Sequence, residues 1–276
     1  MPSDVENPIS PVLAFTESEA NAVQRMLEKL VRALREVPGG GKIEEGYWSY
    51  IYHTVRDAPI GTWSNLTMRD FCYAGLGVEM KLLRRRSPIA EQGHSLMHPA
   101  ATRTIAFNPL LDAETCKIQI LEQFASQIRE FRSRVSETCL DCQPDIRWGI
   151  FLWSPKLDEF LYFEETIKEP DPNDFVAQFI EGKHRGKPTR NLHIFEKGTG
   201  IKRFSVTMPA KGAKLQPYFD VPLVDEGAYT FRIPNDGRKA IWLKNETIDA
   251  IQKASKNYDQ DMDNLIISAL RALVGP

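Results

Sequence analysis

The chain has 276 residues, of which 42% are hydrophobic and 26% are charged. This length suits one large domain or a core domain with a small appendage, and the ordinary balance excludes collagen-like, low-complexity and largely disordered chains. No run of eighteen apolar residues is present, so we expect no membrane-spanning segment. The acidic start MPSDVENPIS lacks the apolar stretch of a signal peptide, which predicts a cytoplasmic protein. The formal net charge of −2, taken alone, argues weakly against a nucleic-acid binder.

Hydrophobic periodicity predicts an alternation of helices and strands. The predicted elements are, in chain order, helices at Thr16–Leu34 and Ile43–Val55, strands at Leu66–Tyr73 and Leu76–Leu83, a long helix at Ala113–Val135, strands at Arg147–Trp153 and Phe160–Phe163, a helical turn at Phe175–Ile180, and strands at Leu192–Phe195, Phe204–Met208 and Tyr229–Ile233. This order predicts a mixed α/β or α+β fold, with a small central mixed sheet flanked by helices. We expect an N-terminal helical region at 1–58, a central domain at 59–235 and a strand-helix-helix segment at 236–276.

The cysteines offer one pair with metal or redox spacing, Cys139-Leu-Asp-Cys142. A zinc site would need Cys116 or a distant histidine to complete four ligands. Reduced thiols in a cytosolic protein are the favoured interpretation.

The clearest pattern for chemistry lies between Arg69 and Lys81. On a strand, Glu79 and Lys81 share one face, and Asp70 on the neighbouring strand can fold back alongside them. Two carboxylates at a strand edge suit Mg²⁺ and leave positions for water and phosphate. The predicted metal ligands are therefore Asp70 and Glu79. Lys81 would orient or deprotonate the attacking water and offset charge that develops on the phosphate.

This pattern resembles the PD-(D/E)XK nuclease superfamily, whose active site is Asp, a spacer, then Glu/Asp-x-Lys on adjacent strands. The eight-residue spacer between Asp70 and Glu79 is within the range used by its type II restriction endonucleases, and Arg69 stands where the motif has Pro. Over about 43–153, the resemblance implies a restriction-endonuclease-like fold, Mg²⁺ as cofactor and double-stranded DNA as substrate. Asp70, Glu79 and Lys81 would be its catalytic residues. An upstream helix often supplies a further acid, and either Glu44 or Glu45 is available.

A second match to the motif combines Pro170-Asp171 with Glu181-Gly182-Lys183. Residues 173–180 between them have helical periodicity, and Gly182-Lys183 opens a polar loop. We therefore expect this match to be fortuitous.

Basic residues gather in three runs that are predicted to contact DNA phosphates. From Lys183 to Lys214 there are nine basic residues and one acid, Glu196, and the segment 183–190 is predicted to be a loop. A single run usually forms a solvated surface, but three beside one metal site favour a DNA-binding face. The residues predicted to contact DNA are Arg84, Arg85, Arg86, His98, Arg103, Lys183, Arg185, Lys187, Arg190, Lys202 and Arg203.

The C-terminal segment reads as a strand at Arg238–Glu246 followed by helices at Thr247–Tyr258 and Asp261–Val274. It is similar to the ribbon-helix-helix fold of small dimeric repressors, in which alternate strand residues such as Trp242 would face the major groove. A terminal helical hairpin used for packing or dimerisation fits the pattern equally well. Both interpretations favour a homodimer.

The sequence thus predicts a Mg²⁺-dependent type II restriction endodeoxyribonuclease, which hydrolyses phosphodiester bonds at a short specific sequence in double-stranded DNA. The alternatives are a DNA-binding regulator that uses the C-terminal segment and a structure-specific repair nuclease. No Walker, HExxH or GxSxG motif supports ATP use, zinc proteolysis or serine hydrolysis. The net charge averages basic runs with acidic surfaces such as Glu164-Glu165, so it does not exclude DNA.

Overall fold

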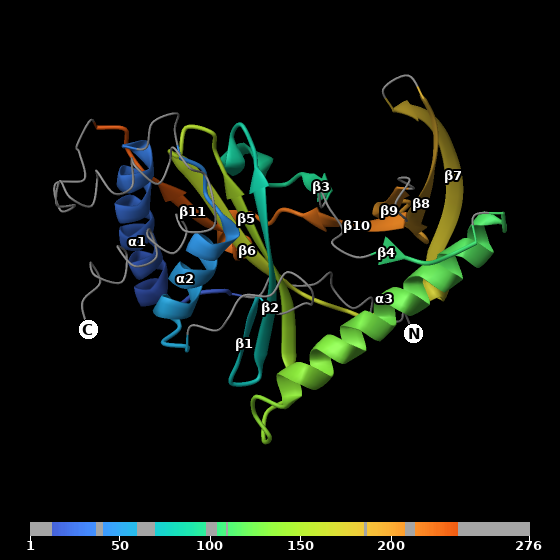
Figure 1. Cartoon of the computed structure of the whole chain (residues 1–276), viewed down its shortest axis with the longest axis horizontal. Coiled ribbons are helices and arrows are strands. Elements are labelled where there is room, and N and C mark those ends of the chain that lie inside the picture. The colour runs from blue at the N-terminus through green and yellow to red at the C-terminus, as the bar shows by residue number, and fades with distance from the viewer. Residues whose placement is uncertain are drawn as a thin grey trace, which may run out of the picture.

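The computed structural model describes residues 13–36, 41–59, 70–97, 104–108, 110–184, 187–207 and 213–236. Across these ranges, three α-helices and two mostly antiparallel sheets form a mixed α and β fold (Figure 1). The predicted fold class is confirmed at this level, but two sheets stand where we predicted one. None of the described helices has the length and apolar character needed to cross a bilayer.

The first sheet has the strand order β1-β2-β5-β6-β11, and β2 and β5 are parallel. Its strands are β1 (Phe71–Tyr73), β2 (Leu76–Arg84), β5 (Asp145–Trp153), β6 (Glu159–Thr166) and β11 (Tyr229–Arg232). A parallel pair needs a crossover connection, and the long helix α3 (Ala113–Ser136) lies within it. The β1–β2 hairpin and its two-residue turn agree with the strands predicted at Leu66–Tyr73 and Leu76–Leu83. Residues 66–69 of the first predicted strand lie outside the described ranges.

Two N-terminal helices, α1 (Glu17–Arg35) and α2 (Glu45–Val55), pack on one face of this sheet (Figure 1). A capping box between Thr16 and Glu19 starts α1 by satisfying free amide groups of its first turn. The helices and sheet share one apolar core, in which Trp48 stacks on Phe151 of β5 at a centroid distance of 4.1 Å. This core fixes α2 over the middle of the sheet.

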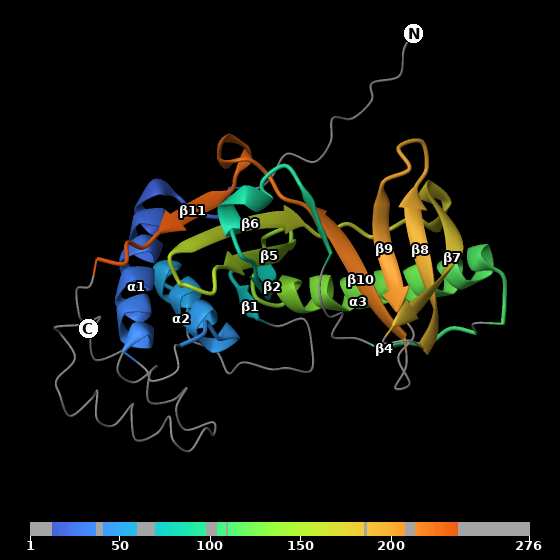
Figure 2. The ribbon, with the colours of Figure 1, turned by 90° about the horizontal axis from the view of Figure 1, so that it is seen from above.

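The second sheet has the order β3-β10-β9-β8-β7, with β4 paired to β10. Its strands are β3 (Ser95–Met97), β4 (Thr104–Ile105), β7 (Phe175–His184), β8 (Lys187–Glu196), β9 (Lys202–Thr207) and β10 (Ala213–Asp220), and the 3-10 helices are η1 (Pro88–Glu91), η2 (Pro172–Asp174) and η3 (Val224–Glu226). Ile120 and Phe124 of α3 share a core with Leu192 and Val206 of this sheet, and Figure 2 shows α3 running along it.

The two sheets meet through a third apolar cluster, to which β2, β3, β5 and β10 contribute Leu83, Leu96, Ile150 and Phe219. The other end of α3 contacts the first sheet at Gly77 of β2. A Cβ atom at Gly77 would lie 2.3 Å from Val135 Cγ2, so only glycine permits this approach of helix and strand.

The predicted helical turn at Phe175–Ile180 is wrong, because this segment is the first part of β7. Phe175, Ala177 and Phe179 pack against the α3 core, while Val176 and Gln178 are exposed, which is the period of a strand. Pairing with β8 along the whole strand outweighs the local helical pattern. The predicted loop at 183–190 is likewise wrong where it is described, since 183–184 and 187–190 belong to the β7–β8 hairpin.

The prediction of reduced thiols is wrong for Cys139 and Cys142. These two residues form a disulfide within the loop that connects α3 to β5. Cys116 is a free thiol. The disulfide packs on the β1–β2 turn, where a Cβ at Gly75 would lie 3.0 Å from Cys142 Cβ. A zinc site on this pair is therefore excluded in the oxidised protein. The predicted C-terminal strand and helices lie outside the described residues.

Candidate active site

The β1–β2 hairpin brings Asp70 and Glu79 together. Its register pairs Phe71 with Val78, and one further step along the same register sets Asp70 opposite Glu79. The turn residues Ala74-Gly75 have φ of 48° and 81°. Two-residue hairpin turns of this kind need positive φ at both positions. The turn therefore fixes which residues face each other at the open end of the hairpin.

Strand alternation separates the charged residues of β2 from its apolar residues. Val78 and Met80 are buried in the core beneath α1 and α2. Glu79 and Lys81 lie on the opposite face, where Lys81 Nζ is 2.9 Å from Glu79 Oε1. Their side chains are only 4% and 12% exposed for Glu79 and Lys81 respectively, so this ion pair is largely shielded from water. The predicted alternation is confirmed.

Asp70 is half-buried, and its carboxylate accepts a hydrogen bond of 2.6 Å from the Met80 amide. Burial raises the pKa of Asp70 from 3.8 to about 7, and the negative charge of Glu79 adds to this increase, while Lys81 and the Met80 amide oppose it. A carboxyl group with such a pKa is destabilised in its charged form. A cation between Asp70 and Glu79 would relieve this repulsion.

Lys81 is held in its charged form. Burial alone would lower the pKa of Lys81, but the charges of Glu79 and Asp70 outweigh burial and raise it. At neutral pH the side chain is an ammonium group. It can therefore donate hydrogen bonds and neutralise negative charge, but it cannot accept a proton.

Glu45 at the start of α2 belongs to the same electrostatic group. Burial raises the pKa of Glu45, and the charges of Lys81 and Glu79 both act on it. Glu45 in turn raises the pKa of Asp70. Glu44 forms an ion pair of 2.5 Å with Lys42. Of the two acids that the sequence left open, the structure thus associates Glu45 with the site.

One oxygen in the site lacks a hydrogen-bond partner. Glu79 Oε2 is buried, and no donor reaches it among the described residues. An unsatisfied buried polar atom costs at least about 1–3 kcal/mol, and more when it is charged. Among the residues that the structure describes, no three His, Cys, Asp or Glu side chains converge to form a metal site. Mg²⁺ often uses only one or two carboxylates and keeps several waters, so Asp70 and Glu79 fit this ion.

Three arginines lie at the end of β2: Arg84 is its last residue, and Arg85 and Arg86 follow it. Arg84 lies over the Trp153 ring at 5.7 Å, and Trp153 belongs to the core beneath the N-terminal helices. Arg84 therefore lies on the opposite face of the sheet from Lys81. The side chain of Arg85 pairs with Glu91 at 3.6 Å, and Arg86 is exposed.

Several residues of the second sheet that were predicted to contact DNA interact with other residues of that sheet. Arg190 pairs with Glu181, and Arg203 pairs with Glu196 and Asp220. Lys202 Nζ lies 4.5 Å from the centre of the Tyr218 ring. These ion pairs reduce the charge that the two arginines offer to phosphate. His98, Arg103 and Arg185, and the side chains of Lys183 and Lys187, lie outside what the structure describes.

The second motif match does not form a site. Asp171 caps η2 by accepting a hydrogen bond from the Asn173 amide, and the Glu181 side chain is 73% exposed. From Phe175 to Glu181 the chain is one extended strand, a length of about 20 Å. The two acids therefore cannot meet. The segment between them is a strand and not the expected helix. Even so, this motif match brings no carboxylates together.

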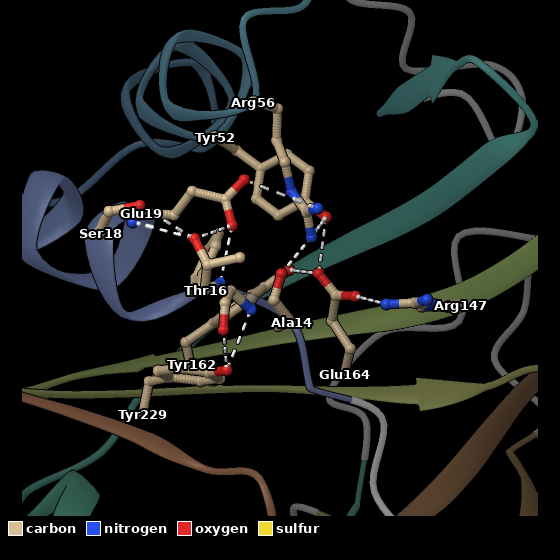
Figure 3. Close-up of polar contacts among 11 residues, drawn as sticks. Ala14, Thr16, Ser18, Glu19, Tyr52, Arg56, Arg147, Tyr162, Glu164 and Tyr229 are labelled. Atoms are coloured by element: carbon tan, nitrogen blue, oxygen red, sulfur yellow. Dashed lines mark hydrogen bonds and ion pairs between the residues drawn. The ribbon is translucent and has the colours of Figure 1, made fainter.

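A buried polar network on the helix-covered face of the first sheet was not predicted (Figure 3). Glu164 is fully buried and accepts hydrogen bonds from Tyr52 at 2.6 Å, Tyr162 at 2.8 Å and Arg147 at 2.9 Å. Its assignment to an acidic surface is therefore wrong. The sequence feature that could have indicated this network is the presence of charged residues within apolar strands, namely Arg147 in β5 and Glu164 in β6. The network ties α2 to the sheet.

Comparisons with protein-family models, with curated proteins and with solved structures each found no match.

Proposed function

We propose that the protein is a Mg²⁺-dependent endodeoxyribonuclease that hydrolyses phosphodiester bonds in double-stranded DNA. The observation that carries this proposal is the pair of carboxylates, half-buried Asp70 and buried Glu79, beside the ammonium group of Lys81. Glu79 Oε2, which has no hydrogen-bond partner among the residues that the structure describes, supports a cation between them. The arrangement is that expected from the resemblance to PD-(D/E)XK nucleases.

Each residue has a role that follows from its environment. Asp70 and Glu79 would hold Mg²⁺, which when bound polarises a phosphate and lowers the pKa of a coordinated water. Lys81, charged at neutral pH, would orient the attacking water and offset negative charge on the phosphate. Glu45, whose pKa is raised by burial, would be the additional helix acid that the resemblance implies.

Cleavage assays on supercoiled plasmid test the proposal. The wild-type protein should cut in Mg²⁺ and not in EDTA, while Asp70→Asn, Glu79→Gln and Lys81→Ala should each lose at least about 100-fold in rate, as expected for groups that act on the transition state. Glu181→Gln is a matched control from the second motif match and should cut normally. Failure of the wild-type protein to cut, or full activity of Lys81→Ala, would refute the proposal.

We further propose that cleavage occurs at a short specific sequence and that the protein acts as a homodimer, as the resemblance implies and a palindromic target would require. Phage DNA digested with the protein should then give discrete bands. A smear, or cutting only at branched or damaged sites, would favour a repair nuclease. Sequence-specific binding in Ca²⁺ without cleavage in Mg²⁺ would favour a DNA-binding regulator.

A further inference from the structure

His53 connects α2 directly to the main chain of Asp70. Its ring is buried near the C-terminal end of α2, with the residue 7% exposed. Nδ1 lies 2.7 Å from the carbonyl oxygen of Pro59, and Nε2 lies 3.4 Å from the carbonyl oxygen of Asp70. One imidazole thus contacts the residues on both sides of 60–69.

Asp70 lies one residue before the first paired residue of the β1–β2 ladder, Phe71. The bond from the Met80 amide holds its carboxylate to β2, and a contact from α2 reaches its main chain. Besides the hydrogen bond from the Met80 amide to its carboxylate, Asp70 has its carbonyl oxygen 3.4 Å from His53 Nε2, a contact that is a hydrogen bond when Nε2 carries the hydrogen. The ring of His53 also packs edge-on against Phe71 at 4.8 Å. Both contacts act on the position of Asp70.

The helix that carries His53 is itself rigidly attached. Tyr52, the neighbouring residue, donates a hydrogen bond to the buried Glu164, which Tyr162 and Arg147 also contact (Figure 3). A contact made from such an element is precise, because the element cannot move without breaking a buried network.

We propose that His53 is a positioning residue, which holds the main chain of Asp70 so that the Asp70 carboxylate meets Glu79 at the metal site. This inference rests on the proposed function, because it assigns His53 to the same cation site. Groups that orient a metal ligand typically contribute 10–100-fold to metal affinity.

Binding of Mn²⁺, measured by calorimetry on the full chain, tests the inference without depending on cleavage. His53→Phe keeps an aromatic ring against Phe71 but removes the contacts of both ring nitrogens with the carbonyl oxygens of Pro59 and Asp70. We expect its Mn²⁺ affinity to fall at least about tenfold, with the Mg²⁺ concentration for half-maximal cleavage rising in parallel. His53→Gln retains an N–H donor and should recover part of the loss.

Tyr229→Phe is the structural control. It removes the hydrogen bonds between Tyr229 Oη and the main chain of Phe15, which involve neither His53 nor Asp70. Its melting temperature should fall while its Mn²⁺ affinity stays at the wild-type value. Asp70→Asn should bind no Mn²⁺ at this site.

The outcomes separate the two proposals. Wild-type affinity for Mn²⁺ in both His53 variants would overturn the positioning role and leave the nuclease proposal intact. Absence of Mn²⁺ binding by the wild-type protein would overturn both. If His53→Phe does not fold, an affinity of His53→Gln equal to that of wild type would still overturn the positioning role.

Discussion

Asp70 keeps a half-buried carboxyl group beside a second carboxylate, an arrangement that costs stability whenever both are charged. The pKa of Asp70 is about 7 in the folded protein, against about 4 in an unfolded chain. Between these values the folded state holds a proton that the unfolded state has lost. The contribution of Asp70 therefore makes stability fall as pH rises from about 4 to about 7.

Replacing Asp70 should expose this cost directly. In EDTA at pH 8, Asp70→Asn should melt a few degrees above the wild-type protein, because its amide carries no charge to bury. At pH 5 the gain should be smaller. Thermal melts at the two pH values measure the difference. An identical gain in melting temperature at both pH values would mean that the charge of Asp70 is not its cause. The same variant should be inactive in the cleavage assay.

Among the elements, β2 depends on close contact with α3 at a single position. Alanine at Gly77 would place Cβ 2.3 Å from Val135 and 2.8 Å from Phe131. Either the helix or the strand must then shift, at a cost of about 1–3 kcal/mol. Gly46 in the first turn of α2 has open space around its Cβ position. Alanine there should instead stabilise the helix by up to about 1 kcal/mol.

These two glycine-to-alanine changes should therefore have opposite signs. Urea unfolding of Gly77→Ala and Gly46→Ala measures both free energies under the same conditions. A neutral effect of Gly77→Ala would show that α3 does not press on β2 as closely as the structure indicates.

The sequence was most informative where the local pattern and the fold agree. The β1–β2 hairpin could be predicted because the Ala74-Gly75 turn and the alternation around Glu79 indicate the same register. The strand β7 could not, because pairing with β8 outweighs a helical pattern in 173–180. The choice of Glu45 over Glu44 depends on where α2 packs, which no local signal specifies. His53 was missed because its partners are main-chain carbonyl groups, which have no sequence signature.

At the scale of the whole molecule, Glu165 lies where the two sheets face each other. It belongs to β6 of the first sheet, and the charges of Arg203 and Asp220 in the second sheet act on it. Burial raises the pKa of Glu165 from 4.5 to about 7, while Arg203 opposes the increase. Stability from this group is therefore greatest at low pH and decreases as pH rises from about 4.5 to about 7.

Glu165→Gln should reduce the dependence of the free energy of unfolding on pH between about 4.5 and about 7. Above pH 7 the variant should be more stable than wild type by about 3 kcal/mol at most, since each unit of pKa is worth about 1.4 kcal/mol. Near pH 4.5 the two proteins should be similar. Glu181→Gln, whose carboxylate is exposed, should show no such dependence. A pH profile for Glu165→Gln parallel to that of wild type would rule out Glu165 as its source.

The order of strands along the chain has a consequence for how the molecule assembles. The chain builds β1 and β2 in the first sheet, passes to β3 and β4 in the second, returns for β5 and β6, leaves again for β7 to β10 and ends in the first sheet with β11. No single break in the polypeptide separates one sheet from the other. Neither half can be inherited, exchanged or lost as a continuous segment. Folding must also wait for pairings between distant residues, such as β6 with β11, before either sheet is complete.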